Sequence, residues 1–215
     1  MRVGVLALQG AHRPHVATLE RLGHRCSLVR APADLRDIEG LVLPGGESTT
    51  MLTLLRARGL LDMLREPPLI PVLATCAGLI LVAAVVTGPR QTSLGWLDVE
   101  VARNGYGSQL DSAVVESDPP DPRRLVLIRA PRITRVGPEV SVELRHRGEP
   151  MLVRQGRCYG ATFHPELTAD SWLHRRVFGA LDGARAADHG DATPDALPAL
   201  PSPAAPRLPV LSPRR

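Results

Sequence analysis

The 215-residue sequence contains no lysine, so its positive charge comes entirely from arginine. This absence excludes Schiff-base chemistry and a P-loop lysine from the chain. Aromatic residues make up only 3% of the sequence, and the arginines are scattered rather than clustered. Because nucleic-acid surfaces combine basic patches with stacking side chains, this composition disfavours a nucleic-acid-binding protein.

Long hydrophobic runs are missing too. The longest, Ala77 to Val86, has ten residues, which is about half the length that crosses a bilayer. The N-terminal segment lacks the features of a secretory signal, and we therefore predict a cytoplasmic protein without membrane contact. Cys26, Cys76 and Cys158 are an odd number of cysteines at wide spacings. They argue against a disulfide framework and a zinc site, and they are compatible with a single reactive thiol.

Two regions of the chain differ in composition. Over residues 1–182, apolar periodic segments alternate with turn signals, which predicts one folded domain. Residues 183–215 are rich in proline and contain no aromatic side chain. Such a segment cannot bury enough apolar surface to fold. We predict a disordered C-terminal tail, which is either an unselected extension or a docking arm for another protein.

The N-terminal half alternates between buried strand patterns and helical patterns. Strands are predicted over 2–8, 25–30, 40–44 and 69–74, and helices over 10–23, 48–64 and 77–86. After Gly88 the patterns become shorter and more alternating, with strands predicted over 95–103, 124–131, 140–146, 151–155 and 158–165 and a closing helix over 169–182. Alternation of this kind predicts an α/β fold. We expect three layers: a mostly parallel central sheet, helices on both faces, and a small additional mixed or antiparallel strand set.

Cys76 lies at a predicted strand-to-helix turn. In the stretch ATCAG, Ala74 and Gly78 flank the cysteine two residues away on either side. This is the pattern of a nucleophile elbow, where small side chains let strand and helix approach closely. A helix that begins just after the sulfur would also favour the thiolate. Taken alone, the pattern fits a buried structural cysteine equally well. Cys26 and Cys158 lie in strand patterns without such a turn, and we interpret them as structural.

A nucleophilic thiol needs a base, and the base needs an orienting group. His164 ends a strand pattern in the stretch FHPE, with Glu166 two residues later. On an extended strand these two side chains project to the same side, and Pro165 stiffens the backbone between them. The pair predicts a Cys76, His164 and Glu166 triad. The other histidines have no carboxylate so placed, and we interpret them as surface or packing residues: His12, His15, His24, His146, His174 and His189.

The stretch LVLPGGESTT places two glycines directly after a predicted strand. Their backbone N–H groups can face a developing oxyanion, and Glu47 and Ser48 add polar side chains at the same rim. The same pattern is typical of a glycine turn followed by a serine or threonine helix cap. Both interpretations are compatible with each other.

Six stretches together resemble one protein family. LALQGA, LVLPGGESTTM, TCAGLILVA, VARNGYGSQLDS, IRAPRI and FHPELTAD occur in the order and approximate spacing found in the glutaminase subunit of pyridoxal 5′-phosphate synthase, a class I glutamine amidotransferase. The resemblance extends from Val3 to about Leu181. The cysteine elbow and HPE are typical of the superfamily, whereas PGGEST, RNGYGSQLDS and IRAPRI are typical of this member.

The resemblance implies hydrolysis of L-glutamine to glutamate and ammonia. Cys76 would be the nucleophile, His164 would move protons, and Glu166 would orient His164. The glutamine-binding residues implied are Gly46, Glu47, Ser48, Arg103, Ile128 and Arg129, and the oxyanion donors are Gly46 and Ala77. An arginine suits the carboxylate of an amino acid because its planar fork binds it bidentately. The implied partner is a (β/α)₈-barrel synthase subunit that uses the ammonia, and no cofactor or metal is implied.

Three positions depart from the family pattern: Ala74 replaces a glycine, Pro14 a glutamate and Ala113 a phenylalanine. None of them belongs to the predicted triad, but Pro14 and Ala113 could each remove a contact with the partner. Two other functions fit part of the pattern. A glutamine amidotransferase with another ammonia acceptor would not need RNGYGSQLDS and IRAPRI, and a non-catalytic binding or redox module would need neither HPE nor GGES.

Overall fold

The computed structural model describes residues 1–105 and 112–179. The predicted tail, residues 183–215, lies outside the described residues, as do residues 106–111 of the RNGYGSQLDS stretch. The predicted division of the chain at residue 182 therefore stays a prediction. Within the described part, no helix is long and apolar enough to cross a membrane.

The centre of the fold is a seven-stranded sheet with the strand order β10-β11-β12-β4-β3-β1-β2. Its strands are β1 (Arg2–Leu6), β2 (Arg25–Val29), β3 (Gly40–Leu43), β4 (Val72–Thr75), β10 (Ser141–His146), β11 (Glu149–Gln155) and β12 (Cys158–Ala161). From β12 to β2 all neighbours are parallel, whereas β11 pairs antiparallel with both β12 and β10. The inner strands β1, β3 and β4 are buried and mainly aliphatic apart from the exposed Arg2, as expected for a sheet covered on both faces, whereas in the edge strand β2 only Val29 is buried.

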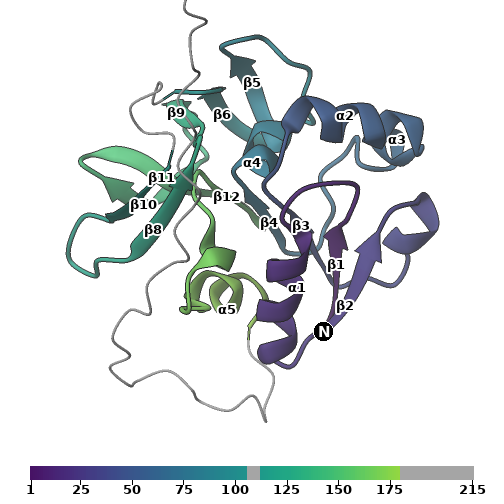
Figure 1. Ribbon diagram of the computed structural model, residues 1–215. Coiled ribbons are helices and arrows are strands. Elements are labelled where there is room, and N and C mark those ends of the chain that lie inside the picture. Colours follow the sequence, from purple (N-terminus) through teal and green to yellow (C-terminus); the bar gives the residue numbers. More distant parts are fainter. Residues whose placement is uncertain (106–111, 180–215) are drawn as a thin grey trace, which may run out of the picture. The chain divides into compact units, whose positions relative to one another are not determined.

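Helices cover both faces of this sheet (Figure 1). They are α1 (His12–Arg21), α2 (Ser48–Ala57), α3 (Leu60–Met63), α4 (Ala77–Val82) and α5 (Trp172–Phe178). Alternate residues of β3 point to opposite faces. Leu41 and Leu43 belong to the apolar cluster that includes α2, α3 and α4, while Val42 packs in the cluster that includes α1 and α5. The result is the predicted three-layer α/β arrangement.

Two smaller sheets follow α4 in the chain. β5 (Ala83–Thr87), β6 (Leu97–Ala102) and β9 (Arg132–Val136) form a mixed sheet, and β7 (Ser112–Glu116) pairs antiparallel with β8 (Arg124–Ile128). Two short 3₁₀ helices, η1 (Pro32–Leu35) and η3 (Pro165–Leu167), complete the described elements. The fold class, including the small extra strand set, is confirmed.

Two predicted helices were too long, and three strands were not predicted. The helix expected over 77–86 ends at Val82, because the β-branched residues that follow pair with β6 as strand β5. The helix expected over 48–64 is broken at Gly59, whose φ of +68° interrupts the helix. β5, β7 and β9 were missed because each is short and defined by its pairing rather than by a strong pattern of its own.

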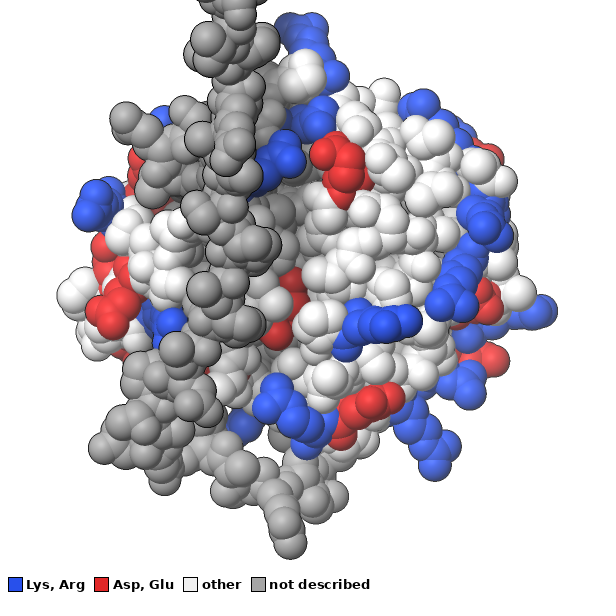
Figure 2. Space-filling view, in the orientation of Figure 1, with Lys and Arg blue, Asp and Glu red and all other residues white. Residues whose placement is uncertain are grey.

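Charged side chains are dispersed over the face shown in Figure 2. Arginines alternate with acidic residues and uncharged surface, and no large area of a single sign is visible among the coloured residues. Many arginines are paired with carboxylates, for example Arg132 with Glu149 at 2.7 Å. This distribution agrees with the dispersed arginines of the sequence.

Candidate active site

Cys76 occupies a strained turn between β4 and α4. Its φ of +49° is unfavourable for a residue with a side chain. The turn depends on Gly78, because a Cβ at that position would lie 2.0 Å from the carbonyl oxygen of Leu43 in β3. Ala74 is fully buried in β4, so its methyl group is accommodated. The sequence pattern around Cys76 thus forms the sharp elbow that it predicted.

The pairing of β12 with β4 brings His164 to the same end of the sheet as Cys76. Thr75 at the end of β4 is paired with Ala161 at the end of β12, and the backbone N–H of Cys76 donates to the carbonyl oxygen of Ala161 at 2.8 Å. The chain leaving β12 is then held by a hydrogen bond of 2.8 Å from the N–H of His164 to the carbonyl oxygen of Val126 in β8. The loops that follow β4 and β12 therefore meet at the carboxyl edge of the sheet, where open α/β folds bind ligands.

The carboxylate of Glu166 lies directly behind His164. Oε1 of Glu166 is 2.7 Å from Nδ1 of His164. The expected geometry was wrong, however, since Glu166 lies in η3 rather than on an extended strand. The 3₁₀ turn after His164 folds the carboxylate back onto the ring. Burial acts to lower the pKa of His164, but the interactions with Cys76 and Glu166 outweigh it and raise that pKa to about 10.

The glycine turn after β3 borders His164. A Cβ on Gly45 would lie 2.3 Å from Cε1 of the His164 ring, so only glycine leaves room for the imidazole. The carbonyl oxygen of Gly45 accepts a hydrogen bond of 3.1 Å from the N–H of Ala11. Because the peptide bond is planar and trans, the N–H of Gly46 points to the side opposite this carbonyl.

Glu47 has two roles in the structure. Its Oε1 caps α2 by accepting hydrogen bonds from the backbone N–H of Thr49 at 3.3 Å and from the Thr49 hydroxyl at 2.8 Å. The same oxygen pairs with Nη2 of Arg103 at 3.1 Å. The cap is thus glutamate, and the expected serine or threonine cap is wrong. The hydroxyl of Ser48 instead donates to Oε1 of Gln91 at 2.8 Å. The hydrogen bond from Thr49 is the main cause that lowers the pKa of Glu47, and the carboxylate is ionised.

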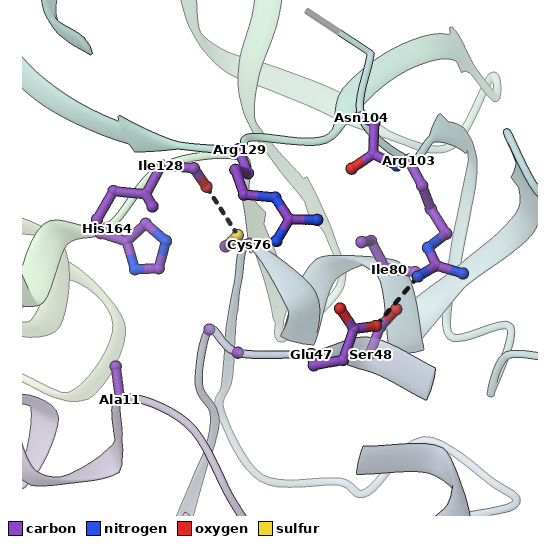
Figure 3. Close-up of a pocket in the computed structure, with 12 residues that line it drawn as sticks. Ala11, Glu47, Ser48, Cys76, Ile80, Arg103, Asn104, Ile128, Arg129 and His164 are labelled. Atoms are coloured by element: carbon purple, nitrogen blue, oxygen red, sulfur yellow. Dashed lines mark hydrogen bonds and ion pairs between the residues drawn. The ribbon is translucent and has the colours of Figure 1, made fainter. Parts of the chain in front are cut away.

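These residues surround one cavity of about 260 Å³, a size suited to a small polar ligand. Its lining includes Cys76, His164 and all six residues predicted to bind glutamine: Gly46, Glu47, Ser48, Arg103, Ile128 and Arg129. In Figure 3 the ring of His164 lies on one side of Cys76 and the guanidinium groups of Arg103 and Arg129 lie on the other. The carbonyl oxygen of Ile128 is 3.8 Å from Sγ of Cys76.

Three further lining residues were not predicted: Ala11, Ile80 and Asn104. Gly45, which also lines the cavity, belongs to the predicted glycine turn, and Asn104 directly follows the predicted Arg103, which was the available signal. Asn104 and Arg129 also have positive φ values, +54° and +44°, as Cys76 does. Backbone strain of this kind gathers at functional sites. The predicted residues Ala77 and Glu166 do not line the cavity. Ala77 directly follows Cys76 in the chain, and Glu166 contacts the ring of His164.

His15 and His174 pack against each other, but the expectation that no carboxylate lies beside His15 was wrong. Both are fully buried. Nε2 of His15 lies 3.3 Å from Oε2 of Glu166, so the second oxygen of the triad carboxylate faces another histidine. The sequence could not show this contact, because α1 is far from Glu166 along the chain.

Cys26 and Cys158 lie outside the cavity, and burial raises the pKa of their thiols to about 11 and about 12, respectively. Neither thiol forms thiolate readily near neutral pH. Within residues 1–105 and 112–179, no three His, Cys, Asp or Glu side chains are grouped to hold a metal ion.

The sequence from residue 5 to residue 178 matches the SNO glutamine amidotransferase family. The chain belongs to this family. A protein of Koribacter versatilis called pyridoxal 5′-phosphate synthase subunit PdxT is 49% identical over 177 residues, which cover 81% of this chain and 92% of that protein. A protein of the same name from Solibacter usitatus is 48% identical over 190 residues, which cover 84% of this chain and 99% of that protein.

A solved structure described as a glutamine amidotransferase is also similar to this family member. It superposes with a TM-score of 0.76 at 40% sequence identity, covering 81% of this chain and 96% of the other. The predicted membership of the glutamine amidotransferases and the predicted glutaminase activity are confirmed by these matches.

Proposed function

We propose that Cys76, His164 and Glu166 hydrolyse L-glutamine in this cavity and that the ammonia serves the synthesis of pyridoxal 5′-phosphate. The observation that best supports the proposal is the β12 and β4 register, since Cys76, which follows β4, and His164, which follows β12 and contacts Glu166, line the same cavity. Around them lie the six residues that the family resemblance implies for glutamine binding.

The reaction has two stages. Sγ of Cys76 attacks the side-chain amide carbon of glutamine, and the oxyanion accepts hydrogen bonds from the backbone N–H groups of Gly46 and Ala77. Protonated His164 gives its proton to the amide nitrogen as the C–N bond breaks, which releases ammonia and leaves a glutamyl thioester. Neutral His164 then takes a proton from water, which attacks the thioester, and the C–S bond breaks to release glutamate and Cys76.

Recognition of the amino-acid end of glutamine falls to charged residues of the cavity. Arg103 and Arg129 provide guanidinium groups for the α-carboxylate. The ionised Glu47 provides an acceptor for the α-ammonium group. Because Arg103 already pairs with Glu47 at 3.1 Å, both charges are held in place before the substrate arrives.

The partner in this proposal is a pyridoxal 5′-phosphate synthase subunit of the (β/α)₈-barrel type, in agreement with the names of the relatives. The absence of lysine fits a chain that supplies ammonia and leaves lysine chemistry to its partner. We place the reaction in the cytoplasm, since all three cysteines are free thiols, as a reducing compartment keeps them.

The test is glutamate production by the purified chain, with and without a cognate synthase subunit. Cys76→Ser should abolish the activity. We expect the isolated chain to be slow and the partner to accelerate it, because one lost oxyanion donor costs about 10²–10³ in rate and the Gly45 and Gly46 peptide can reorient at little steric cost. Absence of glutaminase activity in a complex shown to form would refute the proposed function. Equal rates with and without partner would refute the activation alone.

A further inference from the structure

Two buried imidazoles lie behind the candidate triad. His15 projects from α1 and His174 from α5, and neither has any exposed surface. Nδ1 of His15 is 2.8 Å from Nε2 of His174. On its other side, Nε2 of His15 is 3.3 Å from Oε2 of Glu166 and 3.3 Å from the hydroxyl of Thr75. The pair thus reaches the carboxylate oxygen that His164 does not use.

Charge states follow from burial and contacts. Burial lowers the pKa of His15 although Glu166 acts in the opposite direction, and burial likewise lowers the pKa of His174. Both rings are therefore neutral near pH 7. Burial acts to raise the pKa of Glu166, but its contacts outweigh burial, and the hydrogen bond from protonated His164 is the one among them that persists beside a neutral His15, so the carboxyl group is ionised. An ionised carboxylate only accepts hydrogen bonds.

The hydrogen-bond partners of the two neutral rings then fix which nitrogen of His15 and of His174 carries the proton. If His15 carries its proton on Nε2, it faces Oε2 of Glu166 and the Thr75 oxygen, and its bare Nδ1 accepts from Nε2–H of His174. Nδ1 of His174 is then unprotonated, which agrees with its having no partner within the described residues. The opposite assignment buries an unpaired N–H on His174 and sets two lone pairs against each other at 3.3 Å, both of which are costly.

We propose that His15 is a positioning residue of the glutaminase site, with its Nε2–H, fixed by His174, holding the carboxylate of Glu166 against His164. The inference rests on the proposed function, because it assigns His15 a role in that same triad. Oε2 of Glu166 has no well-aligned hydrogen bond within the described residues. Nε2 of His15 lies 3.3 Å from this oxygen, a distance longer than an ideal hydrogen bond.

Loss of this donor has a specific consequence. A buried carboxylate oxygen without a donor is strongly destabilised, which raises the pKa of Glu166 and frees the carboxylate to turn away from Nδ1 of His164. His164 would then be oriented less well in both stages of the reaction. Glutamine binding would not change, because His15 does not line the cavity.

The experiment compares His15→Phe, which keeps a ring and removes the donor, with His15→Gln, whose amide N–H can replace Nε2–H. In the complex with the synthase subunit, His15→Phe should lower kcat by about tenfold to hundredfold, the usual effect of losing a hydrogen bond to a charged group. KM for glutamine should stay within about twofold, and the acidic limb of kcat/KM should move to higher pH. His15→Gln should restore most of kcat.

His24→Phe is the matched control. His24 is another buried histidine of this region, but its Nε2 bonds to the carbonyl oxygen of Gly179 at 2.9 Å and does not reach Glu166. His24→Phe should lower the free energy of unfolding and leave kcat unchanged. The positioning role is wrong if His15→Phe and His24→Phe have the same kcat, or if His15→Gln is as slow as His15→Phe.

Nitrogen-15 NMR of the histidine rings tests the wild-type protein directly and does not depend on any variant folding. Both His15 and His174 should be neutral with the proton on Nε2, and a proton on Nδ1 of His15 would overturn the assignment. This readout needs no turnover. A wild-type complex without glutaminase activity would therefore refute the proposed function, whereas the wrong tautomer in an active enzyme would refute the role of His15 alone.

Discussion

The backbone N–H of Cys76 donates a hydrogen bond of 2.8 Å to the carbonyl oxygen of Ala161. This single bond joins the ends of two parallel strands that are far apart in the sequence. It fixes where the chain leaves β4 and where it leaves β12, and so it sets the separation between the candidate nucleophile and His164. Because one shifted residue would turn alternate side chains to the other face of the sheet, the register decides whether a triad exists.

The first prediction concerns the three thiols. A glutamine-like electrophile such as a diazo-oxo-norleucine should label Cys76 at about pH 8 and leave Cys26 and Cys158 unlabelled, because burial keeps those two thiols protonated. Peptide mass spectrometry after labelling identifies the modified residue. Cys76→Ser should prevent the reaction. Label on Cys26 or Cys158 with Cys76 unmodified would remove Cys76 as the nucleophile.

The second prediction concerns the elbow. Gly78→Ala should destabilise the protein by about 1–3 kcal/mol, as overpacking does, because its methyl group would lie 2.0 Å from the carbonyl oxygen of Leu43. Glutaminase activity should fall as well, since α4 and Cys76 must shift. Urea unfolding and kcat measure the two effects. Gly148→Ala is the control: it meets no atom within 4 Å, so its positive φ should cost about 1–2 kcal/mol without loss of activity.

The third prediction separates substrate binding from chemistry. Arg103→Ala should raise KM for glutamine about tenfold to hundredfold and change kcat little, because a contact to the α-carboxylate acts equally in the ground and transition states. Arg103→Lys should be intermediate, since lysine lacks the bidentate fork. Arg65→Ala removes an exposed arginine paired with Asp62 outside the cavity and should leave both constants unchanged. A fall in kcat alone for Arg103→Ala would contradict the assignment.

A fourth prediction follows from the pKa of His164, which is about 10 in the folded protein and about 6.5 in an unfolded chain. A group whose pKa is raised by folding stabilises fully below its unfolded pKa, and this stabilisation is lost as the pH rises through the folded pKa. The wild-type protein should therefore have a higher free energy of unfolding than His164→Gln. This difference should be largest at about pH 6 and should become smaller toward about pH 10. Urea unfolding of both proteins across this range measures it; a difference that grows with pH would be the contrary result.

Much of the site is local in sequence and could be predicted from it. The elbow at Cys76 depends on its immediate neighbours, the glycine turn depends on Gly45 and Gly46, and Glu166 is only two residues from His164. Strand and helix types also follow from local apolar periodicity. Even here the structure corrected the geometry, because Pro165 begins a 3₁₀ turn that folds Glu166 back onto the ring.

The sequence by itself thus determined the α/β class, the family and the residue types of the site, because short motifs and periodic apolar patterns carry that information. Only the tertiary structure decided which loops meet. The pairing of β12 with β4, the ion pair of Arg103 with Glu47 and the contact of His15 with Glu166 all join residues from different elements. Such contacts depend on sheet order and helix packing, which burial of the whole core selects and no single segment encodes.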